Sequence, residues 1–347
     1  MANRSDVIET TVISTRIRFA RNFSGFPFPS KMNDACAGDL VQLVAEGLKR
    51  IDPYQYKRYD IGKLSESEAS LMQEQYLISP ALLKRVNGGA AFVSLDGAVS
   101  IMVNEEDHLR EQYICKGFDL YKAYERLSAL DDGLSSVFDF AFDEKLGYLT
   151  ACPSNLGTGM RASVMLFLPA LSKSADLKRY IRELRRRGMT LRGAFGEGSS
   201  AEGYLYQVSN ERTLGWSEQE ILEQVTEVAL WLCELEKAER QRLIETEETE
   251  LRDRCLRAYG ALTNCAILSL DEFLCKVADV RVGILFGFLK ETDSQKFDEF
   301  LDDMRPAAFC LNNNLEGEGE RFCNEVRAET VGSVLPKLVR VVRRGDR

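Results

Sequence analysis

Histidine is almost absent from this sequence, with His108 as its single occurrence in 347 residues. Chemistry that needs two imidazoles, such as a two-histidine metal site, is therefore excluded, and we expect carboxylates to transfer protons. The nine cysteines contain no C-x-x-C pair and have no histidine at metal-binding spacing. We therefore expect no structural zinc and a reducing compartment.

Other signals are also missing. There is no apolar run of about 18 residues and no basic and apolar leader at the start, so we expect a soluble, cytoplasmic protein that does not enter membranes. The P-loop motif G-x-x-x-x-G-K-[ST] does not occur. A net charge of -9 argues against nucleic-acid binding, and we interpret the basic segment 178–187 as a solvated helix face.

Short apolar runs and turn signals fill the first two thirds of the chain. The runs 90–95 and 98–103 flank Asp96 and Gly97, which is typical of a β-hairpin. A helical pattern covers 174–188. Further strand-like runs occupy 147–152, 163–169, 189–195 and 203–210. This pattern predicts an α+β fold in which helices flank an antiparallel sheet.

The pattern changes at Ser217, where Glu220 completes a capping box and apolar residues then recur at helical spacing. The polar stretch 239–254 extends this long helix. Everything after it reads as helices, with a second capping box at Ser269 and Glu272. We therefore predict two domains, a sheet domain over 1–240 and a smaller all-helical domain over 241–347.

The segment "CPSNLGTGMRASV" places Gly157, Gly159 and Ala162 at the spacing G-x-G-x-x-A of a dinucleotide-binding turn. Such a turn must open a helix. The chain continues instead as β-rich "SVMLFLP", which Pro169 closes, so we expect a strand and reject the dinucleotide interpretation.

Five arginines lie in specific settings: Arg16, Arg18, Arg110, Arg161 and Arg192. Two of them, Arg16 and Arg18, are two residues apart on an expected strand, so their side chains point to the same side. Each arginine alone is typical of a surface or an ion pair. As a set they suggest a clamp for a triphosphate, because guanidinium groups bind phosphate oxygens bidentately and stay charged.

Four motifs, "STRIRFARN", "NEEDHLR", "CPSNLGTG" and "RGAFGEGSSAEG", resemble the motif set of the phosphagen kinases, the ATP:guanido phosphotransferases, over about residues 11–240. This resemblance implies a glutamine-synthetase-like catalytic fold that uses ATP and Mg²⁺. Creatine and arginine kinases carry an additional domain before the first motif, where this chain has thirteen residues. With its helical C-terminal region, the chain is more similar to the bacterial protein arginine kinases.

The resemblance implies that Glu106 and Glu197 bind the guanidinium and accept its proton, and that Cys152 helps to hold the cation. Glu105 and Asp107 are the alternatives beside Glu106, and a buried apolar role is the alternative for Cys152. The metal takes its ligands from nucleotide oxygens and water. The implied ATP-binding residues are Ser14, Thr15, Arg16, Ile17, Arg18, Arg110, Arg161, Ala162, Ser163, Val164, Met165, Arg192, Gly193, Ala194, Phe195 and Gly196.

The C-terminal region of the bacterial family carries an Arg-Asp-x-x-Arg-Ala motif that binds phosphoarginine. Its nearest match here is "CNEVRA", in which Cys323 and Asn324 replace the first two residues and Arg327 remains. Two interpretations stay open: Asn324 and Arg327 form a phosphoarginine site, or the chain has no such site. The apolar run 280–289 suggests a homodimer, with an ordinary intramolecular core as the alternative.

The function predicted from these residues is ATP-dependent phosphorylation of arginine side chains in proteins, which would mark them for a stress response or degradation. The resemblance also implies an activator protein and Clp-type protease machinery as partners, besides protein substrates with exposed arginines. Two alternatives remain: a kinase for free arginine or another small guanidino compound, and a catalytically weak scaffold that binds phosphoarginine.

Overall fold

Two compact units make up the chain in the computed structural model, which describes residues 4–51, 55–193 and 202–343. The first unit comprises Met1–Leu166, Lys178–Leu191 and Gln207–Cys233. The second comprises Phe167–Leu177, Arg192–Tyr206 and Glu234–Arg347.

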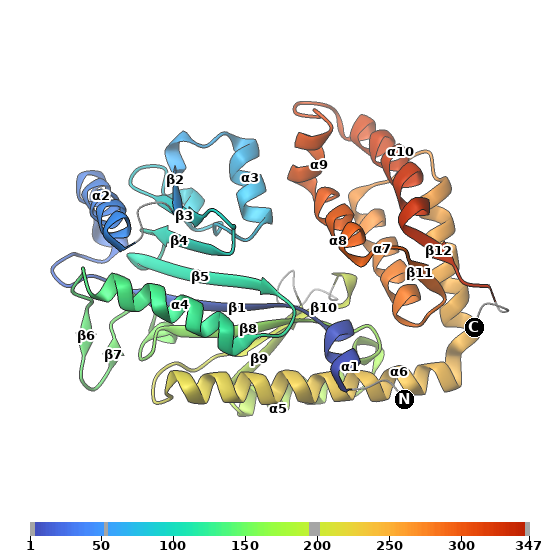
Figure 1. Ribbon diagram of the computed structural model, residues 1–347, viewed down its shortest axis with the longest axis horizontal. Coiled ribbons are helices and arrows are strands. Elements are labelled where there is room, and N and C mark those ends of the chain that lie inside the picture. The colour runs from blue at the N-terminus through green and yellow to red at the C-terminus, as the bar shows by residue number, and fades with distance from the viewer. Residues whose placement is uncertain (1–3, 52–54, 194–201, 344–347) are drawn as a thin grey trace. The chain divides into compact units, whose positions relative to one another are not determined.

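An eight-stranded sheet runs in the order β2-β3-β4-β5-β1-β8-β10-β9 (Figure 1). All pairs from β2 through β8 are antiparallel, as the sequence predicts. The strands are β1 (Val12–Arg21), β2 (Tyr56–Asp60), β3 (Ala90–Ser94), β4 (Val99–Val103), β5 (Leu109–Lys116), β8 (Met160–Phe167), β9 (Met189–Gly193) and β10 (Leu205–Asn210).

The strand predicted over 147–152 is too long. Strand β7 covers only Gly147–Tyr148, where it pairs with β6 (Phe142–Asp143). Beyond it the Asp107 carboxylate accepts a hydrogen bond from the Ala151 amide at 2.6 Å, and Pro153 begins the 3-10 turn η4 (Pro153–Asn155). A side chain therefore binds the Ala151 amide that a sheet ladder would need.

Helices cover the sheet of the first unit. In α2 (Asp34–Ile51) the buried side chains Leu40, Val44 and Leu48 recur every fourth residue, which is the spacing of one helix face. Helix α4 (Leu120–Ser135) packs on β1 and β5. The other helices before α6 are α1 (Arg4–Thr11), α3 (Glu66–Glu74) and α5 (Leu177–Arg186), with 3-10 turns η1 (Pro29–Lys31), η2 (Ile61–Lys63), η3 (Leu82–Lys84), η5 (Leu171–Lys173) and η6 (Glu202–Tyr204).

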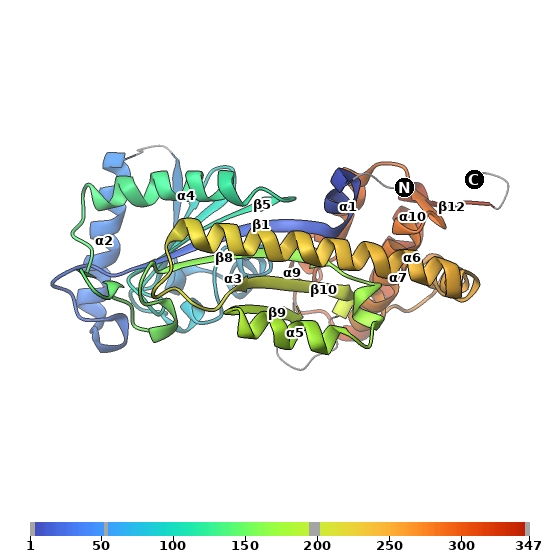
Figure 2. The same cartoon turned by 90° about the horizontal axis from the view of Figure 1, so that it is seen from below.

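The long helix predicted after Ser217 is α6 (Glu218–Asn264). Its capping box is formed, because the Ser217 amide donates to the Glu220 carboxylate at 2.7 Å and the Glu220 amide donates to the Ser217 hydroxyl at 3.2 Å. Figure 2 shows the N-terminal part of α6 running alongside the sheet. The helix is interrupted at Glu247, whose φ is −139°.

The part of the second unit after residue 240 is mainly helical, as predicted, but it is not all-helical, because β11 (Leu289–Glu291) and β12 (Val339–Val341) form a two-stranded sheet. Val280 and Leu289, from the run 280–289, are buried in the core of this unit. That burial removes the sequence argument for a dimer, which stays a prediction. The helices are α7 (Leu270–Leu285), α8 (Ser294–Asp303), α9 (Pro306–Asn312) and α10 (Glu320–Leu338). No helix in the described ranges has the length and hydropathy to cross a bilayer.

Candidate functional site

Four arginines gather on one face of the sheet, over its three central strands. In the antiparallel register Arg18 of β1 lies directly opposite Arg161 of β8, and Arg16 lies opposite Ser163. On the other side of β1, Arg110 of β5 lies opposite Ala20. Directly opposed residues of an antiparallel pair share a face, so these guanidinium groups lie on the same side. This arrangement confirms the prediction that Arg16 and Arg18 point the same way.

The opposite face of these strands forms hydrophobic core. Ile17 pairs with Ala162 and Thr15 pairs with Val164, and all four side chains are buried. These four residues were predicted to bind ATP, but their side chains lie on the other side of the sheet from the arginines. Ser14 and Met165 pair with each other on the arginine face. The two-residue repeat of strands separates the two groups.

Electrostatic repulsion is concentrated on the arginine face. Burial, and next the charge of Arg110, lower the pKa of Arg16 to about 10. Burial, followed by the charges of Arg16, Arg110 and Arg161, holds the pKa of Arg18 well below its usual value. The Nε atoms of Arg16 and Arg18 are buried and have no hydrogen-bond acceptor among the described residues. A polyanion would both neutralise this charge and supply acceptors.

Polar side chains between the arginines were missed by the sequence reasoning. The Arg16 guanidinium donates to the Gln112 side chain. Arg161 donates to the Ser209 hydroxyl at 3.3 Å, and Gln207 donates to the Ser163 hydroxyl at 3.1 Å. Gln112 follows Arg110 by two residues on β5. Because side chains alternate along a strand, this spacing could have predicted that Gln112 lies on the arginine face.

The three acidic side chains of the turn 104–108, between β4 and β5, differ in their burial and in their partners. Glu105 is 5% exposed, accepts a hydrogen bond from Ser79 at 2.5 Å and pairs with Arg110 at 2.6 Å. Asp107 is 2% exposed and accepts hydrogen bonds from Asn22 and from the Ala151 amide. Glu106 is exposed and forms no salt bridge with the described residues. Only Glu106 is thus available to a substrate.

His108 and Asn22 fix this turn to the end of β1. The His108 amide donates to the Asn22 side chain at 2.9 Å. On the imidazole, Nδ1 accepts from the Phe23 amide at 2.9 Å and Nε2 lies 2.8 Å from the Pro27 carbonyl oxygen. These partners select the neutral tautomer that carries its proton on Nε2. The single histidine is therefore a buried structural group.

Cys152 lies beside Glu106. Although the Glu106 side chain as a whole is exposed, partial burial of its carboxyl group, followed by the charges of Asp107 and Glu105, raises the pKa of Glu106, and a hydrogen bond with the Cys152 thiol opposes that rise. The thiol also lies 3.0 Å from the Ser154 hydroxyl. The Asp107 contact to the Ala151 amide holds the loop that carries Cys152 next to the turn that carries Glu106. A carboxylate and a thiol on neighbouring loops can together contact one cationic group.

Other predicted residues lie elsewhere or cannot be placed. Arg192 is exposed on β9, where Gly193 ends the strand. Ala194, Phe195, Gly196 and Glu197 lie outside the described residues.

The residues predicted to bind phosphoarginine lie on α10 of the second unit. Arg327 is 5% exposed and donates to the Leu268 carbonyl at 3.0 Å and to the Asn324 side chain at 2.7 Å. Its Nε is buried and has no hydrogen-bond acceptor in the described part of the chain. The two residues are in contact, and the phosphoarginine site stays a prediction.

Two family models match the sequence. The C-terminal catalytic domain of ATP:guanido phosphotransferases matches residues 39–239, and the C-terminal domain of protein-arginine kinase McsB matches residues 248–340. A protein-arginine kinase of Caldanaerobacter subterraneus subsp. tengcongensis is 39% identical, with 85% of this chain and 88% of that protein aligned. One of Clostridium acetobutylicum is 40% identical, with 84% and 86% aligned.

Solved structures of similar fold include a taurocyamine kinase and a lombricine kinase. A duplicated taurocyamine kinase from Schistosoma mansoni, with bound components of a transition-state analogue, gives a TM-score of 0.63 at 26% identity over 74% of this chain and 38% of that one. A lombricine kinase gives 0.60 at 24% identity over 68% of this chain and 70% of that one, which shows the fold alone.

The buried histidine predicts a pH dependence of stability. Burial lowers the pKa of His108 from 6.5 in the folded protein, so the unfolded chain binds a proton first as the pH falls. The stability that the neutral ring contributes is therefore present above pH 6.5 and lost as the pH falls through the folded pKa. Urea unfolding at pH 7.5 and pH 5.5 should show a smaller loss for His108→Gln, which cannot titrate, than for the wild type. An equal loss would contradict this assignment.

Proposed function

We propose that this chain, which belongs to the ATP:guanido phosphotransferase family, transfers the γ-phosphoryl group of ATP to arginine side chains of proteins. The observation that carries the proposal is that two groups of side chains occur together in the first unit. One is the arginine face of β1, β5 and β8, and the other is the exposed Glu106 beside Cys152.

The arginine face suits the polyphosphate of ATP. The buried Nε atoms of Arg16 and Arg18 have no acceptor among the described residues, and phosphate oxygens would supply one. Arg161 and Arg110 add positive charge on the same face. These groups neutralise the charge that spreads over the transferred phosphoryl oxygens in the transition state. Arg192 on β9 is proposed as a further contact.

Glu106 is proposed to orient the acceptor guanidinium and to take its proton. The guanidinium nitrogen forms a bond to the γ-phosphorus while the bond from that phosphorus to the β-γ bridging oxygen breaks, and the departing proton goes to the carboxylate. The pKa of Glu106 is raised, first by partial burial, and this brings the pKa nearer to neutral pH, which makes the carboxylate a stronger base. Cys152 contacts the same cation, and Glu197 is proposed as a second carboxylate.

Bound Mg²⁺ would neutralise part of the charge on the ATP phosphates. Its ligands would be phosphate oxygens and water, because Mg²⁺ keeps several waters and needs few protein groups.

Protein substrates are favoured over free arginine by the relatives. Proteins named protein-arginine kinase are 38–40% identical to this chain over most of its length. The acidic net charge of -9 also favours encounter with basic, arginine-rich proteins.

The cellular setting belongs to the same proposal. We infer a cytoplasmic enzyme, because none of the nine cysteines, all of which lie in the described ranges, is in a disulfide, as is typical of a reducing compartment. An activator protein, Clp-type protease machinery and a role in stress or degradation are proposed from the resemblance to the bacterial protein arginine kinases, and a homodimer stays a prediction.

The purified protein with radiolabelled ATP tests the function. An arginine-rich protein should accept phosphate faster than free arginine, and the product should be labile in acid because it is a phosphoramidate. Faster ATP consumption with free arginine would favour a small-guanidino kinase. Label that survives acid treatment would exclude arginine as the acceptor.

Glu106→Gln should lower kcat by about 10²- to 10⁴-fold, the range for loss of a general base. Its Kd for ATP and its melting temperature should stay near those of the wild type, because the side chain is exposed and forms no salt bridge with the described residues. Glu66→Gln, at an exposed position on α3, is the matched control. Glu105→Gln and Asp107→Asn should instead lower the melting temperature, since they remove buried partners. Wild-type turnover in Glu106→Gln would reject the assignment.

Arg18→Ala should weaken ATP binding at least about tenfold, because a hydrogen bond to a charged group contributes about 1.5–3 kcal/mol. Arg18→Lys should recover part of the loss, since lysine keeps the charge without the planar fork. Arg58→Ala, on the edge strand β2, controls for loss of charge elsewhere on the sheet. Calorimetric titration measures all three variants, and a change below threefold for Arg18→Ala would contradict the clamp.

A further inference from the structure

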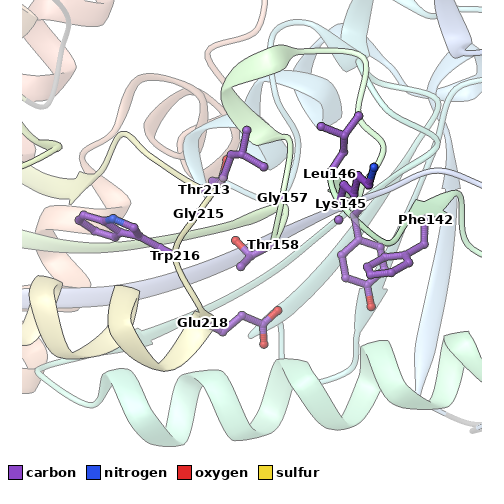
Figure 3. A pocket seen from close by; sticks show the side chains of 12 residues that line it. Phe142, Lys145, Leu146, Gly157, Thr158, Thr213, Gly215, Trp216 and Glu218 are labelled. Carbon is purple, nitrogen blue, oxygen red and sulfur yellow. The ribbon is translucent and has the colours of Figure 1, made fainter.

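A pocket of about 320 Å³ lies in the first unit between the β6–β7 hairpin, the turn before β8 and the segment that leads into the first residue of α6 (Figure 3). Phe142, Leu146 and Tyr148 line it from the hairpin, and Leu214, Trp216 and Glu218 line it from the other segment. None of the residues assigned to ATP or to the acceptor arginine lines this pocket. Its volume is at the lower end of the range of about 300–1,000 Å³ for ligand sites, which suits one long side chain.

Large apolar side chains are exposed around the rim. Phe142 is 58% exposed, Leu146 is 43% exposed and Leu214 is 48% exposed. Single exposed hydrophobic residues are common on protein surfaces, but three around one hollow form a local apolar patch. Trp216 and the T-shaped pair of Phe142 and Tyr148, with ring centroids 5.3 Å apart, add aromatic surface. Such walls suit an aliphatic stem or a planar cation.

Carboxylates outnumber cations around the pocket, whose lining itself holds one of each, Glu218 and Lys145. Glu218 accepts a hydrogen bond from Tyr124 at 2.6 Å and lies 3.9 Å from Arg21, whose guanidinium is already paired with Asp131 at 2.7 Å. Asp132 forms no salt bridge in the described part of the chain. The exposed Lys145 is the cation of the lining, and it follows Asp143 and Glu144 in the hairpin turn.

The pocket walls also hold the loop that carries Cys152. The Thr213 hydroxyl donates to the Ser154 and Leu156 carbonyl oxygens, and the Tyr148 amide donates to the Gly157 carbonyl oxygen at 2.8 Å. Cys152 is four residues from Tyr148, so at 3.8 Å per residue their α-carbons are at most ~15 Å apart. A polypeptide that delivers an arginine to the Cys152 loop therefore has this pocket nearby.

We infer that this pocket binds a second arginine side chain of the protein substrate. The guanidinium would pair with Glu218 and stack on Trp216, while its methylene stem would cover the apolar rim. This inference rests on the proposed function, because it makes the pocket a docking site for the same arginine-bearing proteins. It predicts preference for substrates in which two arginines lie close together.

Tryptophan fluorescence tests binding without measuring activity. The two tryptophans are Trp216 in the pocket and Trp231, which packs against Tyr180 at 5.3 Å, so Trp231→Phe leaves a single reporter. A capped Gly-Arg-Gly peptide should change the Trp216 emission saturably, and the citrulline peptide, an uncharged analogue of similar shape, should not. Adding Glu106→Gln should leave the response intact, and adding Glu218→Gln should weaken the binding at least tenfold. An equal response to citrulline, or none to arginine, would overturn the inference.

Kinetics of peptide phosphorylation provide the second measurement. Phe142→Ala and Trp216→Ala should raise the KM of a peptide with two arginines at least fivefold and leave the KM of a one-arginine peptide and of ATP unchanged. Leu95→Ala removes a side chain that is 77% exposed at the β3–β4 turn and should change neither. Equal effects on both peptides would overturn docking. Absence of phosphorylation by the wild type would reject the proposed function, whereas the fluorescence titration would still decide whether the pocket binds arginine.

Discussion

Side-chain alternation along β1 is the constraint on which the candidate site depends. Arg16 and Arg18 lie on one face of this strand, while Ile17 and Phe19 are buried on the other. A register slip of one residue would exchange the faces and place the guanidinium groups in the core. The hydrophobic core beneath the sheet therefore fixes the direction of the arginine face, and the antiparallel neighbours β5 and β8 add Arg110 and Arg161 to it.

The positions of the Glu106 turn and the Cys152 loop depend on buried polar contacts. Asn22, at the end of β1, is hydrogen-bonded to both Asp107 and the amide of His108. Asp107 in turn binds the Ala151 amide and so holds the Cys152 loop. These groups are buried and satisfied by one another, which is the condition under which buried polar networks stabilise a single arrangement. The same burial explains why Glu106 alone among its acidic neighbours remains open to a ligand.

In the second unit, two features that the sequence singled out take part in internal contacts. Arg327 keeps its place in the motif, but its guanidinium binds the Leu268 carbonyl and Asn324 within the unit. The apolar run 280–289 is likewise taken up by the core of this unit. Internal contacts of the second unit therefore involve both features.

Local sequence determined the elements and the chemistry at hand. Alternation placed Arg16 and Arg18 on one side, the Ser217 capping box began the long helix, and the single histidine excluded any chemistry that needs two imidazoles. Tertiary structure decided what depends on distant partners. It assigned Glu105 and Asp107 to buried contacts and Glu106 to solvent, shortened the strand after Gly147, and assembled the Trp216 pocket from separate segments. Burial and partner identity arise from residues far apart in the chain, so no local pattern encodes them.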